Sequence, residues 1–179
     1  IRVARLQAEK LEQPVAAIAT WKSIVDDFGA DEECYAALLA LYQSEEMHEE
    51  LAALLLETVE RAEPTVGARF AQLGDTCREA LADEQRAVDS YRRALAIEST
   101  NERARTGLHA LLAATEDAEI GRTAAEILAQ AYRVSDELAQ LAELVDVRLG
   151  YETDVSRKQE LLVEAAGVVE PSDQVRAVD

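Results

Sequence analysis

Apolar residues recur at spacings of three and four along most of the chain, which is the pattern of amphipathic helices. The first clear stripe follows Pro14, a residue suited to the first turn of a helix, and ends before Gly29, which suits a left-handed helix end. Its apolar positions are Val15, Ile18, Trp21, Ile24, Val25 and Phe28. Because Trp21 lies on this stripe, we expect it to be buried between neighbouring helices.

The helical pattern continues to the end of the chain, interrupted by short polar links. A second stripe begins at Cys34, and later breaks lie near 82–83, 99–101, 116–117, 135–136 and 150–154, with another at Pro171. These breaks predict about eleven helices joined by short links. Short links make neighbouring helices antiparallel, so the predicted unit is a helical hairpin.

Segments of the chain echo one another, which predicts a repeat architecture. The run EELAALLLETVER at 49–61 returns as DELAQLAELVDVR at 136–148, and DEQRAVD at 83–89 returns as DQVRAVD at 173–179. A period of 34 residues relates Trp21 to Leu55 and Phe70 to Ala104. One hairpin cannot bury its apolar face alone, so we expect the hairpins to stack into a single all-α solenoid over 1–179. A helical bundle without repeats is the structural alternative.

The third predicted hairpin carries the clearest motif. Its residues are Phe70, Leu73, Gly74 and Cys77, followed by Ala87, Tyr91 and Ala94. This pattern resembles a tetratricopeptide repeat, W-x2-L-G-x2-Y followed by Ala-x3-Phe-x2-Ala, with one extra residue between Cys77 and Ala87. The resemblance covers most of the chain in degenerate form. It implies a right-handed superhelix of antiparallel hairpins, in which small residues lie where helices cross.

The phase of the repeat has two interpretations between 101 and 134. The helix at 118–132 is either the second helix of one hairpin or the first helix of the next. The echo at 136–148 favours the second interpretation, which leaves the helix near 102–114 unpaired and predicts a phase slip near 101–135. The chain starts at Ile1 and stops within a helical pattern, so we expect it to be a fragment of a longer array.

Composition narrows the classes of function. The chain has 36 acidic and 18 basic residues, a net charge of −18, and 49% hydrophobic residues, enough for a sizeable core. With only 4% aromatic residues a β-rich fold is disfavoured, and the negative charge disfavours nucleic-acid binding. No stretch is apolar enough to insert into a membrane, and no secretory signal is visible, so we expect a cytoplasmic protein.

The sequence offers little for catalysis. It lacks the glycine-rich nucleotide motifs and the G-x-S-x-G nucleophile motif. His48 lies among glutamates at a helix start, and His109 has no second ligand at metal spacing, so we interpret His48 as a solvated residue and His109 as a partly buried structural one. Cys34 and Cys77 are expected to be buried and unpaired. We therefore expect neither an enzyme nor a bound cofactor or metal.

The resemblance implies a binding function. In tetratricopeptide arrays the first helix of each hairpin lines a concave groove that holds peptides or partner helices. The positions carried over by spacing, polar and without an evident packing role, are Gln43, Asp75, Arg78 and Glu79. The negative charge favours a basic or amphipathic protein or peptide. The alternative function is a structural or regulatory helical spacer attached to another domain, catalytic or not, outside this chain.

Overall fold

The computed structural model describes residues 1–9, 13–29, 32–59 and 66–176, and these form helices and turns without any strand among them. The contacts divide the chain into two compact units, 1–63 and 64–179, and each is described by itself. The described part of the chain is thus all-helical, as predicted. The single array over 1–179 stays a prediction.

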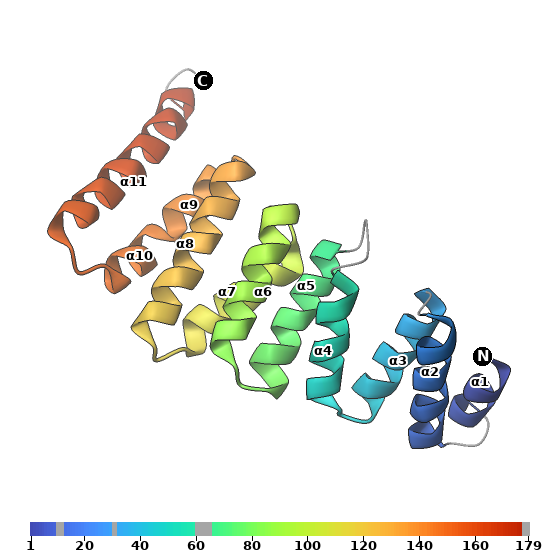
Figure 1. Cartoon of the computed structure of the whole chain (residues 1–179). Coiled ribbons are helices and arrows are strands. Elements are labelled where there is room, and N and C mark those ends of the chain that lie inside the picture. Colours follow the sequence, from blue (N-terminus) through green and yellow to red (C-terminus); the bar gives the residue numbers. More distant parts are fainter. Residues whose placement is uncertain (10–12, 30–31, 60–65, 177–179) are drawn as a thin grey trace. The chain divides into compact units, whose positions relative to one another are not determined.

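The first unit contains four successive helices (Figure 1), namely α1 (Arg2–Glu9), α2 (Pro14–Phe28), α3 (Glu32–Ser44) and α4 (His48–Val59). Each packs against the next in the chain. Helix α2 begins at Pro14, and Gly29 follows it with a φ of 80°, so both predicted helix ends are confirmed. The side chain of Trp21 is 1% exposed, which confirms its predicted burial.

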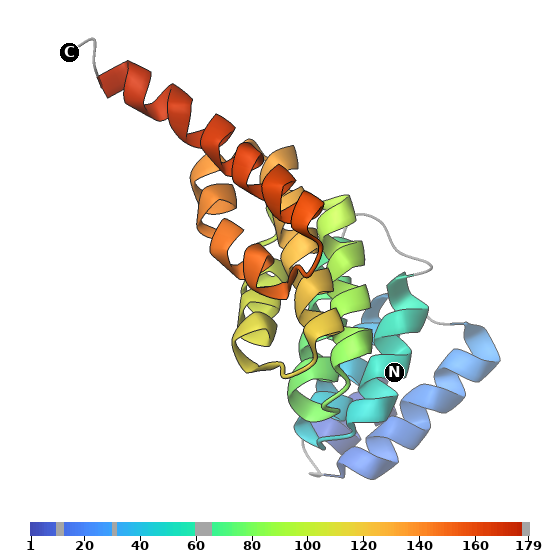
Figure 2. The same cartoon turned by 90° about the vertical axis from the view of Figure 1, so that its left-hand side faces the viewer.

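The second unit continues the alternation of helices and turns (Figures 1 and 2). Its elements are α5 (Val66–Asp75), the π-helical turn η1 (Thr76–Ala80), α6 (Glu84–Ile97), α7 (Glu102–Ala114), α8 (Ala118–Val134), α9 (Leu138–Glu143), α10 (Val145–Tyr151) and α11 (Val155–Arg176). Most of their ends agree with the predicted breaks. The predicted break at Pro171 lies inside α11, and the boundary between α9 and α10 at Leu144 was not predicted. Cys34 and Cys77, one in each unit, are buried and are not joined in a disulfide, as expected.

Three helices of the second unit begin at residues that cap them. The side chains of Asp83, Asn101 and Asp117 each accept a hydrogen bond from a backbone N–H in the first turn of α6, α7 and α8. Such caps satisfy amide groups that have no partner within the helix. These polar residues therefore fix where each helix starts, and they explain why the breaks were visible in the sequence.

Three turns between helices share one geometry, although they lie in different parts of the chain. Each has a non-glycine residue with positive φ, namely Glu46 (55°), Ala82 (51°) and Asp136 (58°). The next backbone N–H bonds back to a helix carbonyl: Met47 to Tyr42, Asp83 to Cys77 and Glu137 to Tyr132, each at 2.9 Å. Two of these bonds span five residues, and the bond to Cys77 spans six. The two five-residue bonds are those of a Schellman helix end, and the turn after Cys77 is a related end with one residue more.

The additional residue of the Cys77 turn is accommodated by η1. A π-helical turn closes bonds five residues apart and holds one residue more than an α-helical turn. The bond from Leu81 N–H to the Thr76 carbonyl, 3.2 Å long, has this spacing. The extra residue noted between Cys77 and Ala87 therefore lies in a local bulge, and the turn after it keeps the shared geometry.

The expectation of an unpaired helix near 102–114 is wrong. Helix α7 packs against α8, and also against α5 and α6. The similarity of 136–148 to 49–61 suggested the wrong pairing because both runs follow a Schellman helix end. Such an end marks where a helix stops, and it can follow either the first or the second helix of a hairpin. In addition, α8 buries residues over a wide face, including the small Gly121, Ala124, Ala125 and Ala129, so it can pack against helices on both sides.

Candidate partner-binding site

The structure brings three of the four predicted site residues together. Asp75 ends α5, while Arg78 and Glu79 lie in η1. The Arg78 guanidinium is 2.5 Å from a Glu79 carboxylate oxygen and 4.0 Å from an Asp75 carboxylate oxygen. Gln43 is exposed near the end of α3 and belongs to the first unit.

Two of these residues have a packing role that we did not expect. The fully buried Tyr91 donates a hydrogen bond from its hydroxyl to Asp75 Oδ1 at 2.6 Å, and that hydroxyl accepts one from Arg78 Nε at 3.3 Å. Arg103 on α7 donates to the other Asp75 oxygen at 2.5 Å. Burial raises the pKa of Tyr91 well above its usual value, and the bond to Asp75 raises it further. Asp75 and Arg78 therefore satisfy a buried phenol, while Glu79 is exposed.

A pocket is lined by the residues that follow Asp75, Arg78 and Glu79 by one repeat period of 34 residues. The counterparts of Asp75, Arg78 and Glu79 are His109, Leu112 and Ala113, on α7. They line a pocket of about 380 Å³, together with Tyr132, Gln140, Glu143, Leu144 and Val147 from α8, α9, α10 and the residue between the last two. The sequence analysis missed this pocket because it treated α7 as unpaired. The 34-residue period was the signal that could have located it.

Two residues that line the pocket, His109 and Tyr132, belong to a larger hydrogen-bonded group. His109 Nε2 lies 2.8 Å from the Tyr132 hydroxyl oxygen, and the Arg105 guanidinium stacks 4.7 Å from the centre of the Tyr132 ring. Arg105 also pairs with Glu137 at 2.8 Å and donates to Ser135 at 2.8 Å. His109 is partly exposed and partly buried, and its bond to Tyr132 gives it the structural contact that we predicted.

The electrostatics keep the imidazole of His109 neutral near pH 7. Partial burial lowers its pKa below the usual 6.5, and the nearby positive charge of Arg105 lowers it further, while Glu143 opposes this. The pKa of Tyr132 is raised by burial. At neutral pH His109 and Tyr132 thus offer uncharged hydrogen-bonding groups to the pocket.

Glu143 is the only carboxylate among the residues that line the pocket. It is exposed and makes no hydrogen bond or ion pair within the described residues. The apolar side chains of Leu112, Leu144 and Val147 also line the pocket. The arrangement therefore combines apolar walls, neutral hydrogen-bonding groups and one carboxylate that is free to pair with a ligand.

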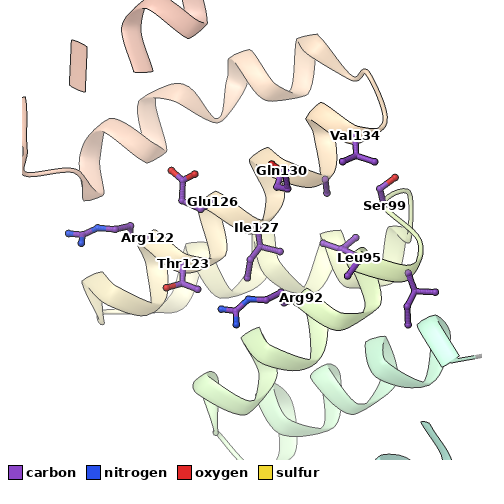
Figure 3. Close-up of a pocket in the computed structure, with 12 residues that line it drawn as sticks. Arg92, Leu95, Ser99, Arg122, Thr123, Glu126, Ile127, Gln130 and Val134 are labelled. Atoms are coloured by element: carbon purple, nitrogen blue, oxygen red, sulfur yellow. The ribbon is translucent and has the colours of Figure 1, made fainter. Parts of the chain in front are cut away.

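A second and larger hollow of about 700 Å³ lies between α6 and α8 (Figure 3). It is largely apolar, with Leu95 and Ile127 inside it and Ile97 and Val134 more than half exposed at one end. Its charged side chains already have partners within the chain. Arg92 pairs with Asp89 at 3.0 Å, Glu126 with Arg148 at 3.1 Å, and Arg122 donates to the Tyr151 carbonyl at 3.0 Å. The smaller pocket, which we call the His109 pocket, therefore offers more polar groups that are available to orient a ligand than the hollow between α6 and α8 does.

Neither metal chemistry nor a membrane is indicated by the described residues. No three of their His, Cys, Asp and Glu side chains are grouped to hold an ion. His48, at the start of α4, is partly exposed. None of the helices described has both the length and the apolarity that crossing a bilayer requires.

No protein-family model, curated protein sequence or solved structure gives a significant match to the chain.

Proposed function

We propose that the chain is a tetratricopeptide-like helical scaffold, without catalytic activity, that binds a segment of a partner protein in the His109 pocket. The pattern of packing in the second unit supports the architecture. Helix α5 contacts α6 and α7, and α6 contacts α7 and α8, so helices pack against both the next helix and the one after it. A stack of helical hairpins with short links has this pattern of neighbours.

The packing of Tyr91 supports the same architecture at the level of side chains. Its ring, on α6, lies against Gly74 on α5 and Gly107 on α7. In a repeat array, α6 would be the second helix of its hairpin, and α5 and α7 would be the first helices of two successive hairpins. The aromatic ring of α6 thus fills the space that the glycines of α5 and α7 leave open. The repeat consensus places an aromatic residue at the position of Tyr91 and a glycine at the position of Gly74, and both agree with this contact.

One observation carries the binding function. His109, Leu112 and Ala113 lie one 34-residue period after the predicted groove residues Asp75, Arg78 and Glu79. They line a pocket that has both apolar walls and hydrogen-bonding groups. Pockets of this kind, largely preformed and with a few polar groups, are the usual sites of ligand side chains. The pocket is therefore where the anchoring residue of a partner segment would lie.

A peptide selection with two matched blocking variants tests this function. Random peptides displayed on phage are selected on the whole chain, and the binders are measured against Ala113→Trp and Ala96→Trp. Both alanines are exposed on helices, Ala113 at the His109 pocket and Ala96 at the α6–α8 hollow. Surface changes of this kind shift stability by only about 0.5 kcal/mol, so both variants should fold.

We expect Ala113→Trp to weaken peptide binding at least about tenfold, a loss of roughly 1.4 kcal/mol, and Ala96→Trp to leave it unchanged. The opposite pattern would place the partner on α6 and α8 and refute the proposed site. A selection that yields no specific binder would contradict the scaffold function and favour the spacer alternative.

A further inference from the structure

We infer that the His109 pocket takes the side chain of a lysine or arginine, and that a proton on His109 competes with that side chain. The inference rests on the proposed function, because it names the residue by which a partner segment would be anchored. It is carried by the charges, the apolar walls and the hydrogen-bonding groups of the pocket.

The charge of the pocket selects the ligand. Glu143 is the one charged group that lines it at neutral pH, and it has no partner within the described residues. The other nearby carboxylate, Glu137, is already paired with Arg105. A carboxylate ligand would face Glu143 and the field of a chain with net charge −18, whereas a cation is attracted by both.

The apolar walls select a long side chain. Leu112, Leu144 and Val147 offer a surface to methylene groups, and lysine and arginine place their alkyl stems on such surfaces while the charged end reaches a polar group. The amide of Gln140 and the hydroxyl of Tyr132 lie among the same lining residues and can accept N–H groups. A purely apolar side chain would use the walls but would leave Glu143 without a partner.

His109 links this binding to pH. The groups that face its imidazole are Arg105 on the same helix, Tyr132 on α8 and Glu143 on α9. A proton on His109 would place a second cation beside the one bound at Glu143, and like charges this close repel. Binding of the ligand and of the proton must weaken each other equally, because linkage is reciprocal. Affinity should therefore be highest above pH 6.5 and fall at lower pH as His109 becomes protonated.

The test uses n-butylammonium, which has the shape and charge of a lysine side-chain end, titrated into the whole chain. The chain has two histidines, so the imidazole proton signals in an NMR spectrum can be assigned with the variant His48→Gln. We expect a saturable shift of the His109 signals but not of the His48 signals. Saturation with n-butylammonium should lower the pKa of His109 further. The affinity should be lower at about pH 5.5 than at about pH 7.5, by a factor that approaches about fivefold, the low end for coupled sites, as His109 becomes fully protonated.

Two variants with the same change in charge distinguish a specific contact from the general field. Glu143→Gln removes the carboxylate of the pocket, and Asp146→Asn removes an exposed one on α10 that does not line it. We expect Glu143→Gln to weaken n-butylammonium binding about fivefold, as expected for one accessible charge pair, and Asp146→Asn to leave it nearly unchanged.

Three outcomes would overturn the inference. They are equal binding to both variants, binding of uncharged n-butanol as tight as that of n-butylammonium, and no saturable shift of His109. None of these outcomes affects the test of the proposed function, in which selected peptides are measured for binding to Ala113→Trp. If that selection succeeds with peptides that need no basic residue, the proposed function stands and only the identity of the anchoring side chain is wrong.

Discussion

At the scale of single residues, the contact between Tyr91 and two glycines shows how closely the helices of the second unit approach. A Cβ atom added at Gly74 or at Gly107 would clash with atoms on the edge of the Tyr91 side chain. The hydroxyl of the same ring is held by Asp75 and Arg78. The ring cannot move away from an added methyl group without breaking these bonds, so both positions require glycine for space and not for backbone conformation.

We predict that Gly107→Ala destabilises the protein by about 1–3 kcal/mol, the usual cost of overpacking. Alanine in a helix is otherwise favoured over glycine by about 1 kcal/mol. The matched control is Gly150→Ala in α10, where an added Cβ meets nothing within 4 Å. We expect that change to raise stability slightly. Urea unfolding followed by circular dichroism measures both, and a stabilised Gly107→Ala would contradict the tight contact.

Only part of this contact could be predicted from the sequence. The repeat motif pairs Gly74 with Tyr91, and that pairing could be recognised from residue types and spacing. The ion pair of Asp75 with Arg103 joins residues 28 positions apart on different helices. In a chain with 36 acidic residues no spacing distinguishes such a pair from chance, so its detection needed the packing of α5 against α7.

At the scale of elements, local signals located most helix ends, because caps and helix-stopping residues act within a few positions of the sequence. Asp83, Asn101 and Asp117 are examples. The pairing of α7 was misjudged because it depends on which faces meet in space. The pocket at His109 was missed for the same reason.

The π-helical turn η1 gives a prediction about chain length. Deletion of the exposed Ala80 should restore a regular α-helical turn and leave the fold intact, with stability changed by no more than about 1 kcal/mol. The bond from Asp83 to Cys77 would then span five residues, as the bonds to Tyr42 and Tyr132 do. Thermal unfolding and helical content by circular dichroism measure the effect.

Deletion of Gln130, also exposed and near the end of a helix, is the control. Helix α8 has no extra residue to lose, so this deletion would rotate Tyr132 and the Schellman turn away from their neighbours. We expect it to unfold the protein or to lower its stability by several kcal/mol, as broken core packing does. If both deletions were equally damaging, η1 would not be the place where an extra residue is absorbed.

At the scale of the whole molecule, the net charge of −18 sets two effects of salt against each other. Salt weakens ion pairs, but exposed pairs such as Arg92 with Asp89 contribute little to stability. Arg105, paired with Glu137, and Arg148, paired with Glu126 and Glu164, have largely buried guanidinium groups, so salt weakens their pairs less than it weakens exposed ones. Salt also weakens the repulsion among the excess acidic residues, which opposes the compact state. The second effect should be the larger one.

We therefore predict that sodium chloride raised from about 0.02 M to about 0.5 M increases the unfolding temperature by about 3 °C, which corresponds to roughly 1 kcal/mol for a chain of this size. Chloride is used because sulfate stabilises proteins whatever their charge. Over the same range, binding of n-butylammonium at Glu143 should weaken, because the attraction between the ligand cation and this acidic protein is screened. Stability and affinity thus change in opposite directions with one variable. A general effect of salt on the fold would move both in the same direction, and a fall in the unfolding temperature would show that ion pairs, not the excess negative charge, dominate the electrostatics.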